Sequence, residues 1–421
     1  MIFLNVSCIF GVSEKSRPYI RGEEMNKIGF IKNGWIRVRD GKIHSYGSMT
    51  EVPELLSGEE KLDCKGCIAV PSFCDSHTHL VYPEERCGEF IDKINGLSYE
   101  EIAARGGGIL NSADKMAYIS EEALYATSLD RLHEIMQKGT GAVEIKSGYG
   151  LTLETELKML RVIARLAESV PITVRATFLG AHAVGRIFAG RQEDYVRHII
   201  DDMLPAVSTQ GIARYVDVFC DKGFFTTDQT DQILTAAARY GLRPKIHGNE
   251  LDESGGVEVA VDNKALSVDH LERAGNRQFE LLGKSQTVAT MLPGASFFLG
   301  MPYGDARSAI RHNAIVSLAS DFNPGSSPSG DMRFVWALGC IKMKLTPVQA
   351  LNAMTVNGAY AMGLENTHGT IAAGRSANFI VSRPLWKDSI LSAEQMLAEI
   401  PYRYTRPWIQ HLVYDGKLFK N

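Results

Sequence analysis

Several features that would place this chain in a special class are scarce or missing. Its 421 residues include only seven cysteines, an odd number whose spacing is not that of a disulfide framework. Cys64 and Cys67 form one CxxC pair, but no second pair follows to complete a four-sulfur zinc site. The cysteines therefore indicate a reducing compartment, and we expect a cytoplasmic protein.

Blocks of Lys or Arg and long apolar runs are also missing. The formal net charge is -4 and the pI is about 6.3, which gives no electrostatic footprint for nucleic acid or an anionic membrane. No stretch approaches the roughly eighteen apolar residues that span a bilayer. The opening MIFLNVSCIFGVSEK has neither a basic leader nor a cleavage site, so it is more typical of a strand. We therefore expect a small-molecule substrate, without nucleic-acid or membrane partners.

Short strands with hairpin turns mark both ends of the chain, while the composition, 45% hydrophobic and 22% charged, is ordinary for a globular protein. The turn signals Asn33-Gly34, Asp40-Gly41 and Asp415-Gly416 separate these strands. The runs with strand character are Gly34 to Val38, Lys42 to Tyr46, Gly369 to Ser382 and Ile409 to Phe419. We predict that residues 1–66 and 366–421 pair into one small composite β domain of the β-sandwich type.

Between the ends, apolar runs of strand length alternate with helix-like stretches, as in parallel βαβ units. The predicted strands are Ile68 to Asp75, Gly141 to Lys146, Thr173 to Leu179, Tyr215 to Cys220, Arg243 to His247, Ala265 to His270, Thr287 to Leu292 and Ile315 to Asp321. Eight parallel strands with alternating helices close into a barrel. The predicted fold is therefore α/β, with a (β/α)8 TIM-like barrel over residues 67–365.

Polar residues gather where these strands end, which in such barrels is the face that carries the reacting groups. Six of the eight strands end in or run into such residues: His77 and His79, Lys146 with Tyr149, His182, His247 with Glu250, Asp269 with His270, and Asp321. Eleven histidines placed at random would rarely produce this pattern.

Four of these residues form a candidate metal site. His77 and His79 are two apart at a strand end, so their side chains share one face, and paired imidazoles suit a divalent cation. His247 and Asp321 supply a third nitrogen and a carboxylate oxygen. Such a set leaves a position open for water, whose pKa the metal lowers towards neutrality. The sequence therefore predicts a catalytic metal site, although Asp321 alone could also be a turn or helix cap.

Two further residues are candidates for proton transfer. His270 ends the sixth strand, from where it could hydrogen-bond the water or move a proton to a leaving nitrogen. Glu250 lies three residues past His247 and could serve as the proton shuttle for a ring nitrogen. A hydrogen-bonded core histidine and a solvated surface glutamate are the plainer alternatives.

From about residue 70 to residue 380 the chain resembles the imidazolonepropionase family. The motifs are DSHTHL at 75 to 80, NGLSYEEIAARGGGI at 95 to 109, VEIKSGYGLTLETELKML at 143 to 160, TFLGAHAV at 177 to 184, HGNE at 247 to 250, VDHLE at 268 to 272 and DFNPGSSP at 321 to 328. Amidohydrolases in general share only the first and the last. The resemblance implies hydrolysis of 4-imidazolone-5-propanoate to N-formimidoyl-L-glutamate in histidine breakdown.

The resemblance also implies site residues. The family's metal ligands fall on His77, His79, His247 and Asp321, in agreement with the residues alone. Its substrate contacts fall on Arg86, Tyr99, Tyr149, His182 and Glu250, with Asn323, Gly325 and Ser326 near the ring. Arg86 offers a forked cation for the propanoate tail, and Gly325 allows close backbone approach. Tyr99 and Tyr149 could instead be packing aromatics.

The resemblance further implies one divalent metal ion per chain, zinc or iron, and a homodimer. Binuclear amidohydrolases bridge their metals with a modified lysine on the fourth strand, but that strand reads YVDVFC here. We expect activated water to attack the ring amide while His270 and the metal stabilise the oxyanion. Glu250 or Asp321 would deliver a proton to the departing nitrogen.

Three loops depart from the family pattern: residues 82–85, 185–190 and 294–303. We expect these departures to affect the affinity for the substrate and not the type of reaction. Two alternatives stay open, another mononuclear amidohydrolase or deaminase acting on a related heterocycle or formimino compound, and a non-catalytic scaffold of the same fold. Gly106-Gly107-Gly108 is not a phosphate loop, because no GK[ST] follows and no strand precedes it.

Overall fold

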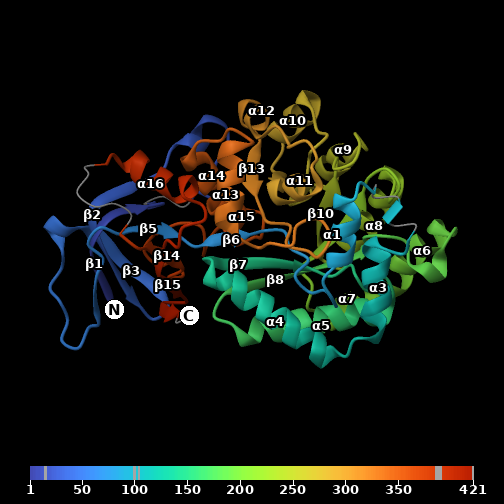
Figure 1. The fold of residues 1–421 in the computed structure, drawn as a ribbon, viewed down its shortest axis with the longest axis horizontal. Coiled ribbons are helices and arrows are strands. Elements are labelled where there is room, and N and C mark those ends of the chain that lie inside the picture. Colours follow the sequence, from blue (N-terminus) through green and yellow to red (C-terminus); the bar gives the residue numbers. More distant parts are fainter. Residues whose placement is uncertain (14–16, 98–100, 103–104, 385–390, 420–421) are drawn as a thin grey trace.

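The computed structural model describes residues 1–13, 17–97, 101–102, 105–384 and 391–419, and these form two separate sheets of eight strands each. In Figure 1 the sheet built from the two ends of the chain lies on the left and the barrel on the right, and both termini lie with the first sheet. The α/β barrel with a smaller β unit, predicted from the sequence, is confirmed.

The smaller unit is one mixed sheet in the order β16-β15-β14-β5-β1-β2-β3, with β4 beside β1. The two Asp-Gly turns predicted from sequence adopt positive φ at both residues, at Asp40-Gly41 and Asp415-Gly416, as tight hairpins require. The strands are β1 (Ile2–Phe10), β2 (Phe30–Arg39), β3 (Lys42–Ser48), β4 (Lys61–Asp63), β5 (Ile68–Pro71), β14 (Phe379–Ser382), β15 (Ile409–Tyr414) and β16 (Lys417–Phe419).

The barrel strands are all parallel and follow the chain in order. They are β6 (Phe73–Asp75), β7 (Thr140–Lys146), β8 (Thr173–Ala181), β9 (Tyr215–Cys220), β10 (Arg243–Gly248), β11 (Ser267–His270), β12 (Val288–Met291) and β13 (Ile315–Leu318). A parallel bridge between Thr78 and Phe322 joins the first strand's extension to that of the last. This closure brings the two ends of the barrel segment together.

One predicted strand is divided in the structure. Ile68 to Asp75 was expected as a single barrel strand, but β5 pairs with β1 and β14 in the terminal sheet, and only β6 belongs to the barrel. Both pieces are fully buried, so the apolar run gives no sign of the change of sheet. The domain limits at 66/67 and 365/366 remain a prediction.

Helices surround the barrel (Figure 1). They are α1 (Cys87–Ile94), α3 (Gly108–Tyr118), α4 (Glu121–Gln137), α5 (Leu153–Ser169), α6 (Gln192–His198), α7 (Leu204–Gln210), α8 (Thr227–Ala238), α9 (Gly256–Asp262), α10 (Asn276–Gly283), α11 (Pro293–Leu299), α12 (Ala306–Arg311), α13 (Met332–Ile341), α14 (Pro347–Met354), α15 (Val356–Tyr360) and α16 (Ala393–Tyr402). Short helical turns add Gly22–Asn26, Met49–Glu51, Arg186–Phe188 and Ile199–Met203.

Local sequence sets several helix starts. The side chains of Ser120, Thr152, Thr226 and Thr346 accept hydrogen bonds from first-turn backbone N–H groups of α4, α5, α8 and α14. Thr226 forms a reciprocal capping box with Gln229. These caps fix where each helix leaves its loop, and therefore where the loops at the strand ends lie.

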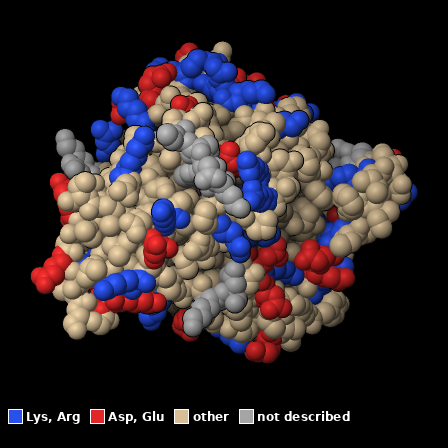
Figure 2. Space-filling model, turned by 60° about the vertical axis from the view of Figure 1, so that its left-hand side comes forward, with Lys and Arg blue, Asp and Glu red and all other residues tan. Residues whose placement is uncertain are grey.

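The surface in Figure 2 carries acidic and basic side chains interspersed over the visible face. This distribution agrees with the small net charge of -4. No helix in the described part of the chain is both long and apolar enough to cross a membrane.

Candidate metal centre and active site

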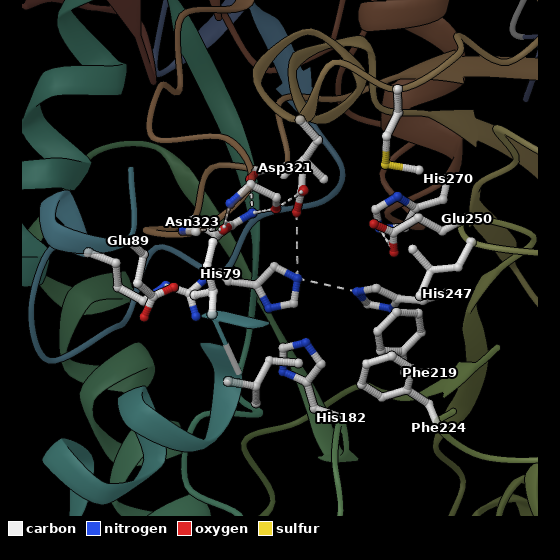
Figure 3. A pocket seen from close by; sticks show the side chains of 18 of the residues that line it. His79, Glu89, His182, Phe219, Phe224, His247, Glu250, His270, Asp321 and Asn323 are labelled. Atoms are coloured by element: carbon white, nitrogen blue, oxygen red, sulfur yellow. Dashed lines mark hydrogen bonds and ion pairs between the residues drawn. The ribbon is translucent and has the colours of Figure 1, made fainter. Parts of the chain in front are cut away.

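A cavity of about 330 Å³ opens at the C-terminal ends of the barrel strands, where the sequence predicts the site. It is lined by residues from at least six strand ends together with α1 and the loops after β10 and β13. Figure 3 shows His79 joined by dashed lines to Asp321 and His247, with His182 and His270 nearby. The predicted residues that line it are His79, Arg86, Tyr149, His182, His247, Glu250, His270, Asp321, Asn323, Gly325 and Ser326.

Three imidazoles meet at the floor of the cavity. The Nε2 atom of His79 lies 3.3 Å from Nε2 of His77 and 3.2 Å from Nε2 of His247. Buried carboxylates hold the other ring nitrogens of two of them: Nδ1 of His77 lies 2.6 Å from Asp269, and Nδ1 of His247 lies 3.0 Å from Asp217. Because Nδ1 donates to a carboxylate, Nε2 of His77 and of His247 keeps its lone pair free.

Asp321 lies beside this cluster because the barrel closes there. Its backbone N–H donates to the carbonyl of His77, and its Oδ1 lies 3.5 Å from Nε2 of His77 and 3.6 Å from Nε2 of His79. Asp321 is not part of β13; it lies beyond it with φ of 53°. The hydroxyl of Ser326 donates to its Oδ2 over 3.1 Å. This backbone turn aims the carboxylate at the histidines.

The four side chains fit a divalent cation. Burial lowers the pKa of each of the three histidines well below its ordinary value, so they are neutral, as metal ligands must be. Burial raises the pKa of Asp321 to about 6, and a cation would offset the cost of its buried charge. His77, His79 and His247 form one group of possible ligands, and His77, His270 and Asp321 form another, so the two groups share His77.

His270 and Glu250 lie side by side in the cavity wall, with Nε2 of His270 3.5 Å from Oε2 of Glu250 (Figure 3). On the other side, Nδ1 of His270 lies 3.5 Å from Glu272, which accepts a hydrogen bond from Ser296. Burial raises the pKa of Glu250. Burial alone would lower the pKa of His270, but the two carboxylates raise it above the ordinary value. Because the two groups lie so close, their protons come off in steps that belong to the pair and not to either residue.

Arg86 forms the opposite wall of the cavity. Its side chain is only 8% exposed, and its Nε lies 3.4 Å from Glu89. Among the described residues, Nε and Nη1 have no hydrogen-bond partner. Gly325 lies against the guanidinium so closely that a Cβ there would fall 1.1 Å from Nη2. A buried cation with unused donors indicates a site for an anionic group.

Tyr149 and His182 belong to a second wall, in which the ring centroids of His182 and His79 lie 5.0 Å apart. Nδ1 of His182 donates to the carbonyl of Gly148 over 2.9 Å, and burial lowers the pKa of this histidine to about 4. His182 is therefore neutral, and its Nε2 can accept a hydrogen bond. Buried Glu156 accepts from the backbone N–H groups of Gly148, Gly150 and Leu151, which fixes the loop carrying Tyr149.

Two of the predicted substrate contacts, Asn323 and Tyr99, differ from the others. Asn323 lines the cavity, but its Oδ1 accepts from the N–H groups of Gly325 and Ser326, and its Nδ2 donates to Asp321 and Ser326. The amide of Asn323 is thus occupied inside its own loop. Tyr99 lies outside the described residues.

Several residues of the site were not found from the sequence. Asp217 sits inside a run of strand residues and Glu156 in a helix, where a carboxylate is ordinarily a surface residue. Alternation could have indicated Asp217, since it is two residues from Phe219, which lines the cavity, and their side chains point to the same face of β9. Glu89 and Lys93 are three and seven residues beyond Arg86 on the helical spacing of α1, and both line the cavity.

The sequence matches the amidohydrolase family over residues 68–419. It is 46% identical to an imidazolonepropionase of Flavobacterium johnsoniae over 98% of this chain and 98% of that protein. An imidazolonepropionase of Parabacteroides distasonis is 38% identical, over 95% of this chain and 94% of that protein.

Solved structures share the fold at much lower identity. Guanine deaminase of E. coli is 15% identical with a TM-score of 0.74, covering 100% of this chain and 99% of that one. A mutant of an atrazine chlorohydrolase from Arthrobacter aurescens, in complex with zinc and atraton, is 13% identical with a TM-score of 0.73, covering 99% of this chain and 94% of that one. At these identities the likeness concerns the fold alone.

Proposed function

The chain belongs to the imidazolonepropionases of the amidohydrolase family, and on that premise we propose how its side chains perform the reaction. It hydrolyses the ring amide of 4-imidazolone-5-propanoate to N-formimidoyl-L-glutamate in histidine breakdown. The observation that carries the proposal for the site is the cavity itself. Four side chains of the metal-ligating kind gather at its floor, and the facing wall offers buried Arg86, whose Nη1 has no hydrogen-bond partner among the described residues.

His77, His79, His247 and Asp321 would hold one divalent cation per chain, either Zn²⁺ or Fe. When bound, the cation lowers the pKa of a coordinated water towards neutrality and polarises the ring carbonyl. A single ion is supported because the two groups of possible ligands share His77, and β9 carries no lysine that could bridge a second ion. The zinc complex of the atrazine chlorohydrolase, which shares the fold, makes zinc the first metal to test.

Arg86 would bind the propanoate tail with its guanidinium, whose Nη1 has no hydrogen-bond partner among the described residues. Because His182 is neutral with its proton on Nδ1, its Nε2 cannot donate to the carboxylate of the tail. We propose that this Nε2 accepts a hydrogen bond from a ring N–H of the substrate. Tyr149 lies beside His79 and His182, with its ring centroid 5.9 Å from that of His79 and 5.5 Å from that of His182. Asn323 acts by holding Gly325 and Ser326, whose loop faces the ring.

Glu250 would move protons during ring opening, with His270 beside it. Glu250 would accept a proton from the attacking water and return it to the departing ring nitrogen, with His270 3.5 Å away to balance its charge. His270, held between Glu250 and Glu272, would donate to the oxygen on which negative charge develops. Asp321 is the alternative group that would deliver the proton to the departing nitrogen.

The test is the loss of ultraviolet absorbance of freshly generated 4-imidazolone-5-propanoate, measured with wild type and His247→Ala alongside metal analysis of both. We expect wild type to consume the compound with about one bound metal per chain, and the variant to do neither. If wild type holds metal but leaves this compound untouched, the substrate assignment is wrong. A deaminase acting on an exocyclic nitrogen would instead release ammonia from a related heterocycle.

We also propose that the protein works in the cytoplasm as a homodimer. All seven cysteines are unpaired in the structure, as expected in a reducing compartment. The homodimer rests on the family resemblance, and light scattering of the purified protein tests it.

A further inference from the structure

A cluster of five charged side chains lies inside the barrel, directly beneath the proposed metal ligands. Glu144, Lys146, Asp217, Lys245 and Asp269 come from β7, β9, β10 and β11, and each is 0% exposed. Three carboxylates and two ammonium groups are thus enclosed where barrels ordinarily pack branched apolar side chains. This buried cluster is not part of the cavity and takes no part in the mechanism above.

Lys146 is the member that reaches the supports of the metal ligands. Its Nζ lies 2.7 Å from Oδ2 of Asp217 and 3.6 Å from Oδ2 of Asp269. Asp217 holds Nδ1 of His247 with its other oxygen, and Asp269 holds Nδ1 of His77. One ammonium group therefore joins the two carboxylates that orient two of the three histidines. Glu144, 2.7 Å from the same ammonium, completes the contacts.

Lys245 belongs to the same cluster but has different contacts. It forms a short ion pair with Glu144 and donates to the backbone carbonyls of Ser76 and Ala361 over 3.1 and 3.3 Å. Lys245 is the strand neighbour of Asp217 on β10, but among the described residues no hydrogen bond or ion pair joins its ammonium group to Asp217 or Asp269. The two lysines are therefore equally buried, but only Lys146 touches the carboxylates that face the histidines.

The free-energy cost of burying these five charges argues that the cluster does more than stabilise the fold. Desolvating buried charges costs several kcal/mol per ion, and well-packed apolar residues are often as stable or more stable. A carboxylate that orients a metal-ligating histidine, by contrast, fixes the ring tautomer and raises the basicity of its other nitrogen. Such a carboxylate needs a counter-charge and a fixed rotamer when it is buried this deeply.

We propose that Lys146 is a positioning residue of the metal centre, which aligns Asp217 and Asp269 so that the Nε2 atoms of His247 and His77 converge on one cation. This inference rests on the metal site assigned above. It predicts that Lys146 sets metal affinity and ligand geometry without touching metal or substrate.

The test compares Lys146→Met with Lys245→Met, two variants that each remove one equally buried ammonium group. Apo proteins are titrated with Zn²⁺ against a competing chelator, and their Co²⁺ forms are compared by visible absorption, which reports ligand geometry. Thermal melting of each apo protein records the structural cost separately. A third variant, Lys146→Met with Asp217→Asn, restores the charge balance if the single variant folds poorly.

We expect Lys146→Met to weaken Zn²⁺ binding by about 10 to 100-fold and to change the Co²⁺ spectrum. Lys245→Met should melt at a lower temperature but keep the wild-type affinity and spectrum. The charge-balanced variant should regain thermal stability without regaining affinity. Equal loss of affinity in the two lysine variants, or wild-type affinity in a folded Lys146→Met, would overturn the inference. If wild type binds no Zn²⁺ while His247→Ala behaves identically, the metal site itself fails, and this inference with it.

Discussion

The contact between Gly325 and Arg86 allows the tail-binding role of Arg86 to be tested without changing the arginine. In Gly325→Ala the new Cβ would lie 1.1 Å from Nη2 and 2.2 Å from Cζ of Arg86. Because a non-bonded carbon and nitrogen approach to about 3.5 Å, the guanidinium must move by about 2 Å. Gly325 has no positive φ, so the substitution adds no strain to its own backbone.

A shift of about 2 Å moves the guanidinium donors out of hydrogen-bond range of the tail. Charge-assisted hydrogen bonds contribute about 1.5 to 3 kcal/mol each, so losing two costs about 3 kcal/mol or more. At about 1.4 kcal/mol per factor of ten, kcat/KM should fall about 100-fold, mainly through KM.

The assay is steady-state hydrolysis of 4-imidazolone-5-propanoate, with Gly88→Ala as the matched control. Gly88 lies in α1 two residues from Arg86, and a Cβ there would meet no atom within 4 Å. Gly88→Ala should leave KM unchanged. A ring compound without the propanoate tail should be turned over equally by Gly325→Ala and wild type. An unchanged KM for the natural substrate in Gly325→Ala would refute the role given to Arg86.

Three further changes have defined outcomes. Glu156→Gln replaces a carboxylate oxygen that accepts from Gly148, so we expect about 1 to 3 kcal/mol lower unfolding free energy in urea and a raised KM, because the loop of Tyr149 loosens. Glu250→Gln should lower kcat by about 10² to 10⁴-fold with little change in bound metal; an unchanged kcat contradicts the proton-shuttle assignment. Burial lowers the pKa of His368 to about 4. Between this pH and about 6.5 the unfolded chain binds a proton at His368 but the folded protein does not. The free energy of unfolding is therefore highest at neutral pH and falls as the pH drops from about 6.5 to about 4. Over that pH range, the free energy of unfolding of His368→Gln, measured in urea, should therefore fall by about 3 kcal/mol less than that of wild type.

The barrel and its reacting face could be predicted from the sequence because both leave local signals. Apolar runs alternate with helical stretches, and His77, His79, His247 and His270 fall at strand ends in the order of the chain. Since the C-terminal ends of parallel strands meet at one face, strand position alone predicts their proximity. The structure brings these four together with Asp321, and all of them except fully buried His77 line one cavity.

What the sequence did not reveal depends on contacts between distant strands. The pairing of Asp217 with His247 and of Asp269 with His77 is fixed by barrel closure and side-chain rotamers, neither of which has a local pattern. The sheet change between β5 and β6 is hidden because both strands are buried on both faces. The tautomer of His182 likewise depends on one carbonyl, that of Gly148, which comes from a different strand end and accepts from Nδ1.

The most direct test of the account is the identity of the product formed from 4-imidazolone-5-propanoate in water enriched in heavy oxygen. The account predicts N-formimidoyl-L-glutamate that retains every nitrogen of the substrate and carries one heavy oxygen in its new carboxylate, with metal-free protein and His247→Ala forming none. Release of ammonia from the substrate, or the same product at the same rate from metal-free protein, would contradict it.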